Sequence, residues 1–381
     1  MDFEIPISLD DFTAQWLTTA FEHNGRGHGP VTEVRAERIA VGEGFLGELA
    51  RLYLSYDEGN EGPQTVIAKI PTTDGALKPL GVMLGVYERE SLFYEQVASK
   101  LEIRIPEVYF NGRDSDNANY ALLLEDVGHY RSGDHLAGAN LPDAVSVMET
   151  AANIHARWWD SEELTAMEWV PPLDSPINMG LQGLYEQSWP TVMDTYGHLY
   201  PDWLPPKLEE FIPEVSNWLI SWAEQSRTLT HNDFRLDNLL FDDAEKVPKV
   251  VVIDFQLVGR GDGSGDIAPF LGCNLDIDLR RNEEISLLQK YFDVMQSNNA
   301  GHETFDDLVR QIDTAHLFWL VNWGNTAVTA DQPNERAVNL FNAVLERSIA
   351  TVVDRDSVQY IGTMNESVSY THLTLPTMDS V

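Results

Sequence analysis

The sequence predicts an α+β protein in which a strand-rich first third is followed by a mainly helical remainder. Short runs rich in β-branched and aromatic residues, separated by turn signals, occupy residues 33–127. Longer stretches with the helical spacing of apolar residues begin after about residue 128, and one short β segment, residues 249–258, interrupts them. A chain of 381 residues exceeds what one small core needs, so we expect one large domain or two lobes.

The strand-rich part begins with a predicted helix over residues 9–20, which has an acidic start. A second helix is expected over residues 85–101, where apolar residues recur at helical spacing around charged ones. The alternation of apolar side chains and the β-rich composition predict strands at 33–41, 48–56, 65–70, 106–112 and 119–127.

The composition restricts the partners of this chain. The net charge of −36, without any run of Lys and Arg, makes nucleic acid and anionic lipid improbable partners. The same charge would favour a cationic small molecule or a bound metal, or would simply keep the protein soluble. Neither a signal peptide nor an apolar stretch of about 18 residues is visible, so we expect a cytoplasmic protein without membrane contact. The only cysteine, Cys273, lies in an apolar context and is expected to be buried and inert.

One segment, "LTHNDFRLDNLLFDD" at residues 229–243, carries the main chemical signal. His231, Asp233 and Asn238 form the pattern H-x-D-x-x-x-x-N, and Asp254 follows sixteen residues later at the end of a Val- and Ile-rich run. A carboxylate at the tip of a buried strand needs a cation or hydrogen bonds to offset its burial. Phosphoryl transfer uses such a set, with one carboxylate for the acceptor and an Asn and a second carboxylate for Mg²⁺.

This segment resembles the catalytic loop of the protein-kinase-like fold, H-R-D-x-x-x-x-N followed by D-F-G. Asn232 stands where that pattern has Arg, and Gln256 stands where it has Gly. With these changes the chain is similar to the aminoglycoside phosphotransferase and choline-kinase-like group, especially its ecdysteroid-kinase-like branch, which phosphorylates small molecules. The resemblance implies that Asp233 is the catalytic base and that Asn238 and Asp254 are the Mg²⁺ ligands.

The same resemblance requires a strand Lys for the α- and β-phosphates and a helical Glu that orients it. Lys69 lies in the strand-like run "TVIAKI", and Glu90 follows about twenty residues later in the second predicted helix. Glu88 and Glu95 are rival candidates on this helix, although the R-E-x-x-F-Y pattern favours Glu90.

Two further parts of a nucleotide site are implied. A glycine loop between the first two strands would cover the phosphates, since glycine lets backbone N–H groups approach phosphate oxygens closely. The segment "YALLLEDVG" resembles the hinge that joins the lobes, with backbone groups near the adenine. The residues assigned by this resemblance are Gly42, Gly44 and Gly47 for the loop, and Leu124, Glu125, Asp126 and Val127 for the hinge.

Residues around the loop receive supporting assignments. His155 and Trp158 would lie beneath the catalytic loop as structural residues, and Asp266 matches a short family motif that usually braces this loop. Arg235 would contact the γ-phosphate or would pair with Asp237 at the surface.

Together these features predict a protein-kinase-like two-lobed fold. An antiparallel-sheet N-lobe would span residues 1–127, a helical C-lobe residues 128–365, and a disordered tail residues 366–381. ATP and Mg²⁺ would be the cofactors, and the acceptor would be a small-molecule alcohol.

Three alternatives remain open at this point. The chain would otherwise be an aminoglycoside or macrolide phosphotransferase, or a catalytically silent nucleotide-binding module. A protein kinase is disfavoured because Gln256 ends the D-F-G-like motif and no A-P-E segment follows it. The acceptor, the choice of ATP or GTP, and the oligomeric state are not determined by the sequence.

Overall fold

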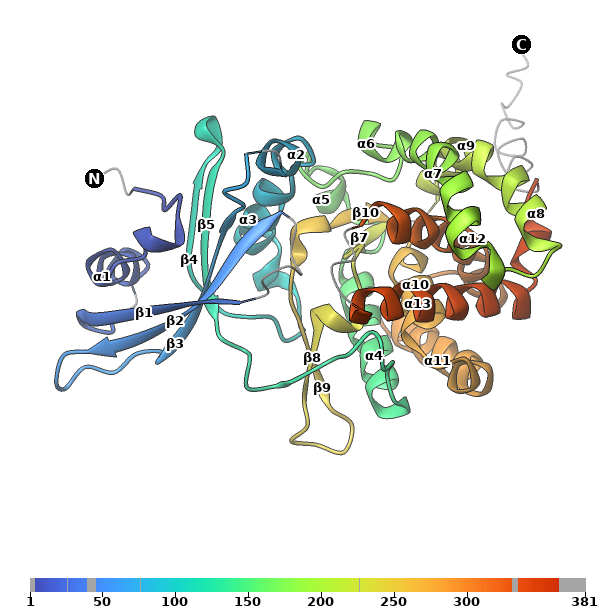
Figure 1. The fold of residues 1–381 in the computed structure, drawn as a ribbon. Coiled ribbons are helices and arrows are strands. Elements are labelled where there is room, and N and C mark those ends of the chain that lie inside the picture. Colours follow the sequence, from blue (N-terminus) through green and yellow to red (C-terminus); the bar gives the residue numbers. More distant parts are fainter. Residues whose placement is uncertain are drawn as a thin grey trace, which may run out of the picture. The chain divides into compact units, whose positions relative to one another are not determined.

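The computed structural model describes residues 4–25, 27–39, 46–75, 77–225, 227–330 and 335–362 (Figure 1). Their contacts group them into two compact units. The first unit contains the residues up to Arg131 together with 240–243 and 251–258, and the second contains the remaining residues. The first unit therefore includes two short segments that were expected in the C-terminal lobe.

A five-stranded antiparallel sheet forms the centre of the first unit. Its strands lie in the order β1-β2-β3-β5-β4, and every neighbouring pair is antiparallel. Their bounds are β1 (Val31–Ile39), β2 (Gly47–Tyr56), β3 (Thr65–Pro71), β4 (Val108–Asp114) and β5 (Asn119–Glu125). In this register, Lys69 of β3 lies between Leu49 of β2 and Leu122 of β5, so it occupies a central strand.

The N-terminal helix differs from its prediction over residues 9–20. A short 3-10 helix, η1 (Leu9–Asp11), ends before α1 (Ala14–His23) begins. Both starts are capped: Ser8 forms a reciprocal capping box with Asp11, and the Thr13 hydroxyl accepts a hydrogen bond from the Trp16 N–H. The cap at Thr13 therefore starts a new helix in the middle of the predicted one.

The other helices of the first unit are α2 (Leu77–Met83), α3 (Val86–Gln96) and the 3-10 turns η2 (Ala98–Lys100), η3 (Ser115–Asn117) and η7 (Phe255–Leu257). The second predicted helix, residues 85–101, is confirmed over most of its length by α3. This helix packs against β4, β5 and η7. The helix α1 places Leu17, Ala20 and Phe21 in one hydrophobic core with the buried face of the sheet.

The second unit is mainly helical, as predicted for the C-terminal part (Figure 1). The long helix α12 packs against α7, α10 and α13, while α4 packs against α11. Its helices are α4 (Leu141–Trp158), α5 (Glu162–Thr165), α6 (Pro176–Met179), α7 (Leu181–Tyr196), α8 (Leu204–Phe211), α9 (Val215–Ala223), α10 (Ser264–Asn274), α11 (Ile277–Ser297), α12 (Phe305–Thr329) and α13 (Glu335–Asp354), with 3-10 turns η4 (Gly197–Leu199), η5 (Ile212–Glu214), η6 (Leu236–Asn238) and η8 (Ser357–Tyr360).

Further short strands lie outside the five-stranded sheet. An antiparallel pair, β7 (Thr228–Thr230) and β10 (Gly259–Gly261), lies within the second unit. Three more strands form a small sheet in the order β6-β8-β9, with bounds β6 (Arg131–Ser132), β8 (Leu239–Asp242) and β9 (Lys249–Val252). The pair β7 and β10 matters most for the site, because the loop with the H-x-D-x-x-x-x-N pattern follows directly after β7.

Two general expectations can be compared with the structure. Within the described residues, no helix combines the length and apolar character needed to cross a bilayer. Cys273 is buried as predicted, its Sγ lies 3.0 Å from Ser348 Oγ, and burial raises the pKa of its thiol to about 12. The predicted tail, residues 366–381, lies outside the described residues.

Candidate active site

The first unit brings Lys69, Glu90 and Asp254 into direct contact. Lys69 Nζ lies 2.8 Å from Glu90 Oε1 and 2.8 Å from Asp254 Oδ1. The three residues come from β3, from α3 and from the turn after β9, so segments far apart in the sequence meet here. The side chain of Lys69 is 12% exposed and that of Glu90 is 5% exposed, whereas Asp254 keeps 27% of its surface accessible. Asp254 is therefore the member of this cluster that can best reach a ligand.

The charged groups of this cluster shift one another's pKa values. Burial alone would lower the pKa of Lys69, but the charges and hydrogen bonds of Asp254 and Glu90 outweigh it and raise that pKa above its usual value. Burial raises the pKa of Glu90, and the charge of Asp254 adds to this, while Lys69 acts in the opposite direction. One ammonium group thus contacts two carboxylates. Because the carboxylates outnumber the ammonium group, the cluster can accommodate a further cation.

The structure selects Glu90 among the three glutamates of this helix. Glu88 accepts a hydrogen bond from the Ser115 hydroxyl, and Glu95 pairs with Arg113 at 2.8 Å. Only Glu90 lies on the buried side of α3. The helix α3 therefore presents Glu90 to the buried side and Glu88 and Glu95 to the exposed side.

The backbone and its neighbours fix Asp254. This residue has φ 64° and ψ 66°, in the left-handed region that Asp tolerates better than most residues. The next residue, Phe255, stacks on Phe93 of α3 with ring centroids 3.8 Å apart. Gln256 Nε2 donates a hydrogen bond of 3.3 Å to Asp254 Oδ2. Lys69 and Gln256 thus hold opposite oxygens of the Asp254 carboxylate.

The second unit holds Asp233 in an equally defined way. Asn238 Nδ2 donates to Asp233 Oδ2 at 2.7 Å and to the Asp233 carbonyl at 2.9 Å. Arg235 Nε donates to Asp233 Oδ1 at 2.8 Å. Both N–H groups of the Asn238 amide are engaged by Asp233, so the atom it can offer to a cation is Oδ1. The Asp233 side chain remains 22% exposed, which leaves it accessible to a reactant.

Arg235 has two carboxylate partners in the structure. Its Nη1 donates to Asp237 Oδ2 at 3.0 Å, which confirms the predicted pairing with Asp237. The contact with Asp233 was not predicted. The Asp-x-Arg spacing was its only signal in the sequence, and residues two apart meet only when the loop backbone folds back on itself.

A buried network supports this loop from below. Asp266 of α10 accepts hydrogen bonds from the backbone N–H groups of His231 and Asn232, at 2.7 and 2.8 Å. Its Oδ2 also lies 3.2 Å from His155 Nε2, and His155 Nδ1 lies 2.8 Å from the Tyr291 hydroxyl. These contacts confirm that Asp266 braces the loop and that His155 lies beside it. The partners also explain why α10 can bury a carboxylate.

The proposed glycine loop can be followed only in part. Gly47 is the first residue of β2. Gly42 and Gly44 lie outside the described residues.

The predicted hinge residues end β5 and continue beyond it. Leu124 and Val127 are buried. The other two side chains are engaged, because Asp126 pairs with Arg51 at 2.6 Å and Glu125 pairs with Arg104. Since both carboxylates are occupied by arginines, the backbone is what this segment can offer to a ligand.

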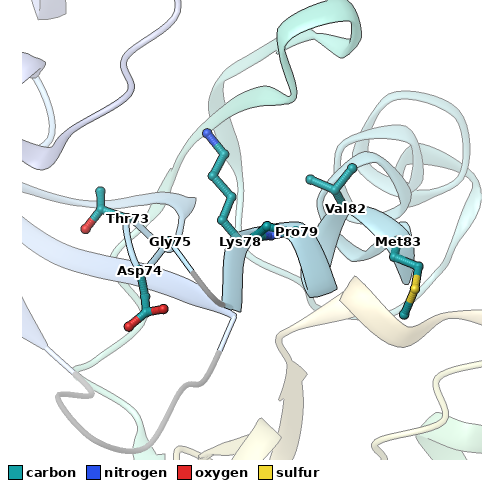
Figure 2. Close-up of a pocket in the computed structure, with 7 residues that line it drawn as sticks. All are labelled: Thr73, Asp74, Gly75, Lys78, Pro79, Val82 and Met83. Atoms are coloured by element: carbon teal, nitrogen blue, oxygen red, sulfur yellow. The ribbon is translucent and has the colours of Figure 1, made fainter.

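Figure 2 shows a cavity elsewhere in the first unit, in the segment after β3 and along α2. Its volume is about 480 Å³, and it contains none of the predicted site residues. The lining residues are Thr73, Asp74, Gly75, Lys78, Pro79, Val82 and Met83. In the part of the chain that the structure describes, no group of three His, Cys, Asp or Glu could hold a metal by itself.

Solved structures of phosphotransferases are similar to this chain in fold. A candidate aminoglycoside phosphotransferase from Ralstonia eutropha is similar with a TM-score of 0.50 and 15% identity, over 90% of this chain and 98% of that one. APH(2")-IIia, solved with GDP and kanamycin, is similar with a TM-score of 0.50 and 14% identity, over 93% and 98% of the two chains. The predicted protein-kinase-like fold, with its antiparallel sheet and helical C-terminal part, is therefore confirmed.

The family is given by the sequence itself. Residues 41–301 match the model of the ecdysteroid kinase-like family, and this chain belongs to that family. No curated protein matches the chain in sequence.

Proposed function

We propose that this protein is an ATP- and Mg²⁺-dependent small-molecule kinase that transfers the γ-phosphoryl group to a hydroxyl. The contact of Lys69 with both Glu90 and Asp254 carries the proposal. These residues are separated by up to 185 positions, and the resemblance to small-molecule kinases assigns Lys69 and Glu90 to nucleotide binding and Asp254 to Mg²⁺. Membership of the ecdysteroid kinase-like family supports the same reaction class.

In this proposal Lys69 is the phosphate-binding cation. Glu90 fixes its ammonium group at 2.8 Å, so the cation is oriented before a nucleotide arrives. A preorganised donor of this kind avoids reorganisation during the reaction, which is why such contacts contribute strongly to catalysis.

Asp254 and Asn238 are each a donor of the kind that suits a magnesium ion. Asp254 offers a partly exposed carboxylate and Asn238 offers an amide oxygen, and Mg²⁺ prefers oxygen ligands from one or two such residues together with water and phosphates. When bound, Mg²⁺ neutralises charge on the phosphate oxygens. We expect Asp254→Ala to weaken Mg²⁺-ATP binding, and unchanged affinity by calorimetry would count against this assignment.

Asp233 is the proposed base for the acceptor hydroxyl. Arg235 and Asn238 hold one oxygen each, so the carboxylate keeps a single orientation while its surface stays partly accessible. Most of the rate enhancement would come from positioning and charge neutralisation, because this chemistry needs no covalent enzyme intermediate.

A screen of acceptors tests the proposal directly. The protein is incubated with Mg²⁺, γ-labelled ATP and a panel of small alcohols and amines that includes an aminoglycoside and a macrolide. Label transfer to one acceptor class supports a small-molecule kinase, and transfer to a drug identifies the antibiotic-phosphorylating alternative. Binding of Mg²⁺-ATP without transfer to any acceptor favours the silent nucleotide-binding module. If the protein does not bind Mg²⁺-ATP at all, the proposal is wrong.

A further inference from the structure

Gln256 is the residue by which this chain departs from the D-F-G pattern, and the structure gives its side chain a partner. Its Nε2 donates to Asp254 Oδ2 at 3.3 Å, while Lys69 Nζ donates to Asp254 Oδ1 at 2.8 Å. The nitrogen end of the amide must face Asp254, because the amide oxygen would be repelled by an ionised carboxylate. A glycine at this position has no side chain and could not make the contact.

The surroundings keep Gln256 in place. Phe255, its preceding neighbour, is buried and stacks on Phe93 with an interplanar angle of 10°. The turn η7 starts from the left-handed backbone of Asp254, and the Val258 N–H closes it on the Phe255 carbonyl. Since α3 carries both Phe93 and Glu90, the same helix positions this turn and Lys69.

The two hydrogen bonds have a chemical consequence for cation binding. A carboxylate can bind a cation through one oxygen or through both. Calcium commonly accepts both oxygens at once, whereas Mg²⁺ requires near-octahedral geometry at short distances and is bound through single oxygens. Both oxygens of Asp254 already accept one hydrogen bond, so a one-oxygen contact uses the remaining acceptor capacity of one oxygen, whereas a two-oxygen contact with a large ion uses that of both.

We propose that Gln256 is a positioning residue that restricts Asp254 to one-oxygen cation binding and so favours Mg²⁺ over Ca²⁺. This inference rests on the proposed function, because it takes Asp254 as a ligand of the nucleotide-associated cation. It assigns the selectivity to a residue that acts through the Asp254 carboxylate.

The test is a binding measurement on the full chain. Mg²⁺ and, separately, Ca²⁺ are titrated by calorimetry into the protein saturated with a non-hydrolysable ATP analogue, and the analogue alone is titrated as a reference. We expect Gln256→Met, which keeps the length of the side chain but removes the donor, to lower the Mg²⁺-over-Ca²⁺ preference by about tenfold, as is typical for residues that orient a metal ligand. Gln256→Ala removes the amide with a smaller side chain and should shift the preference in the same direction.

Gln289→Met is the matched control. Gln289 is exposed on α11 and donates to Asp293 Oδ1 at 2.8 Å, so this variant loses the same kind of amide–carboxylate bond away from the site. Its ion preference should equal that of the wild type. A merely structural role of Gln256 would lower thermal stability or weaken both ions equally, and it would leave their ratio unchanged.

The possible outcomes separate the two claims. If the wild type binds Mg²⁺ and the analogue but both Gln256 variants keep the wild-type ratio, the selectivity role is wrong and the proposed function stands. If the wild type binds no analogue with either ion, the proposed function fails and this inference fails with it. A tenfold loss of preference in both variants, with Gln289→Met unchanged, establishes the role.

Discussion

Lys69 is a cation with little access to water, and two carboxylates share it. Its contact with Glu90 could be anticipated from the sequence, because a strand Lys and a helical Glu in this order match a known scheme. The contacts of Arg235 with Asp233 and of Gln256 with Asp254 could not be anticipated. Each joins residues two positions apart in a turn whose backbone conformation the sequence does not specify.

Glu90→Gln tests the importance of the buried charge. We expect this variant to lose about 1–3 kcal/mol of unfolding free energy, because Lys69 stays buried while one charged partner becomes neutral. The measurement is urea denaturation followed by circular dichroism.

Glu95→Gln on the same helix is the control. Glu95 is 49% exposed in its pair with Arg113, and exposed ion pairs contribute little, so the change should stay within about 0.5 kcal/mol. Equal losses of unfolding free energy in the two variants would mean that the buried pair contributes no more to stability than the exposed one.

At the scale of elements, the sequence predicted whether a segment is a helix or a strand better than it predicted where that segment begins and ends. The strands and the helix α3 follow from alternation and helical spacing, and their centres lie where they were expected. The predicted helix over residues 9–20 divides into η1 and α1, because Ser8 and Thr13 each cap a separate start. A hydroxyl cap can start a new helix within a segment of helical spacing. The prediction used only the spacing of apolar residues, which contains no information on such a cap.

Thr13→Ala tests whether this cap defines the start of α1. The Thr13 hydroxyl accepts the Trp16 N–H at 3.2 Å, and loss of such a cap costs about 1 kcal/mol of stability. Thr19→Ala is the control, since Thr19 is exposed within the helix and Ala has the higher helix propensity. Denaturation curves in which Thr13→Ala is as stable as Thr19→Ala would contradict the role of the cap.

At the scale of the whole molecule, the strand-rich and helix-rich parts were predictable because composition and periodicity change along the chain. The membership of residues 240–243 and 251–258 in the first unit was not, since contacts between distant segments leave no local pattern. The high negative charge is likewise a property of the whole chain, whereas pH dependence arises from individual ion pairs that shift a pKa on folding.

One such pair gives a pH prediction. His302 Nε2 lies 3.2 Å from the buried Asp262 Oδ2. Burial alone would lower the pKa of His302, but the charge of the adjacent Asp262 carboxylate outweighs burial and raises that pKa above its usual value. A raised pKa in the folded state stabilises the protein below the unfolded value, and this contribution is lost as pH rises through the folded value.

His302→Gln should therefore destabilise the protein more at about pH 6 than at about pH 9, because the contribution of the raised pKa is present at low pH and is lost as pH rises. The measurement is the difference in unfolding free energy between wild type and variant at each pH. His198→Gln, at an exposed position, is the control and should show no such trend. A larger loss for His302→Gln at high pH would reverse the assigned sign.

The central claim is that Asp233 acts on the acceptor hydroxyl, and one comparison tests it most directly. With the acceptor found in the screen, wild type and Asp233→Ala are measured for both Mg²⁺-ATP affinity and phosphoryl transfer. We expect transfer to be abolished in Asp233→Ala because the base is removed, while Mg²⁺-ATP binding is retained because the backbone carbonyl of residue 233 still accepts a hydrogen bond from Asn238. Phosphoryl transfer that persists in Asp233→Ala at the wild-type rate would contradict the account.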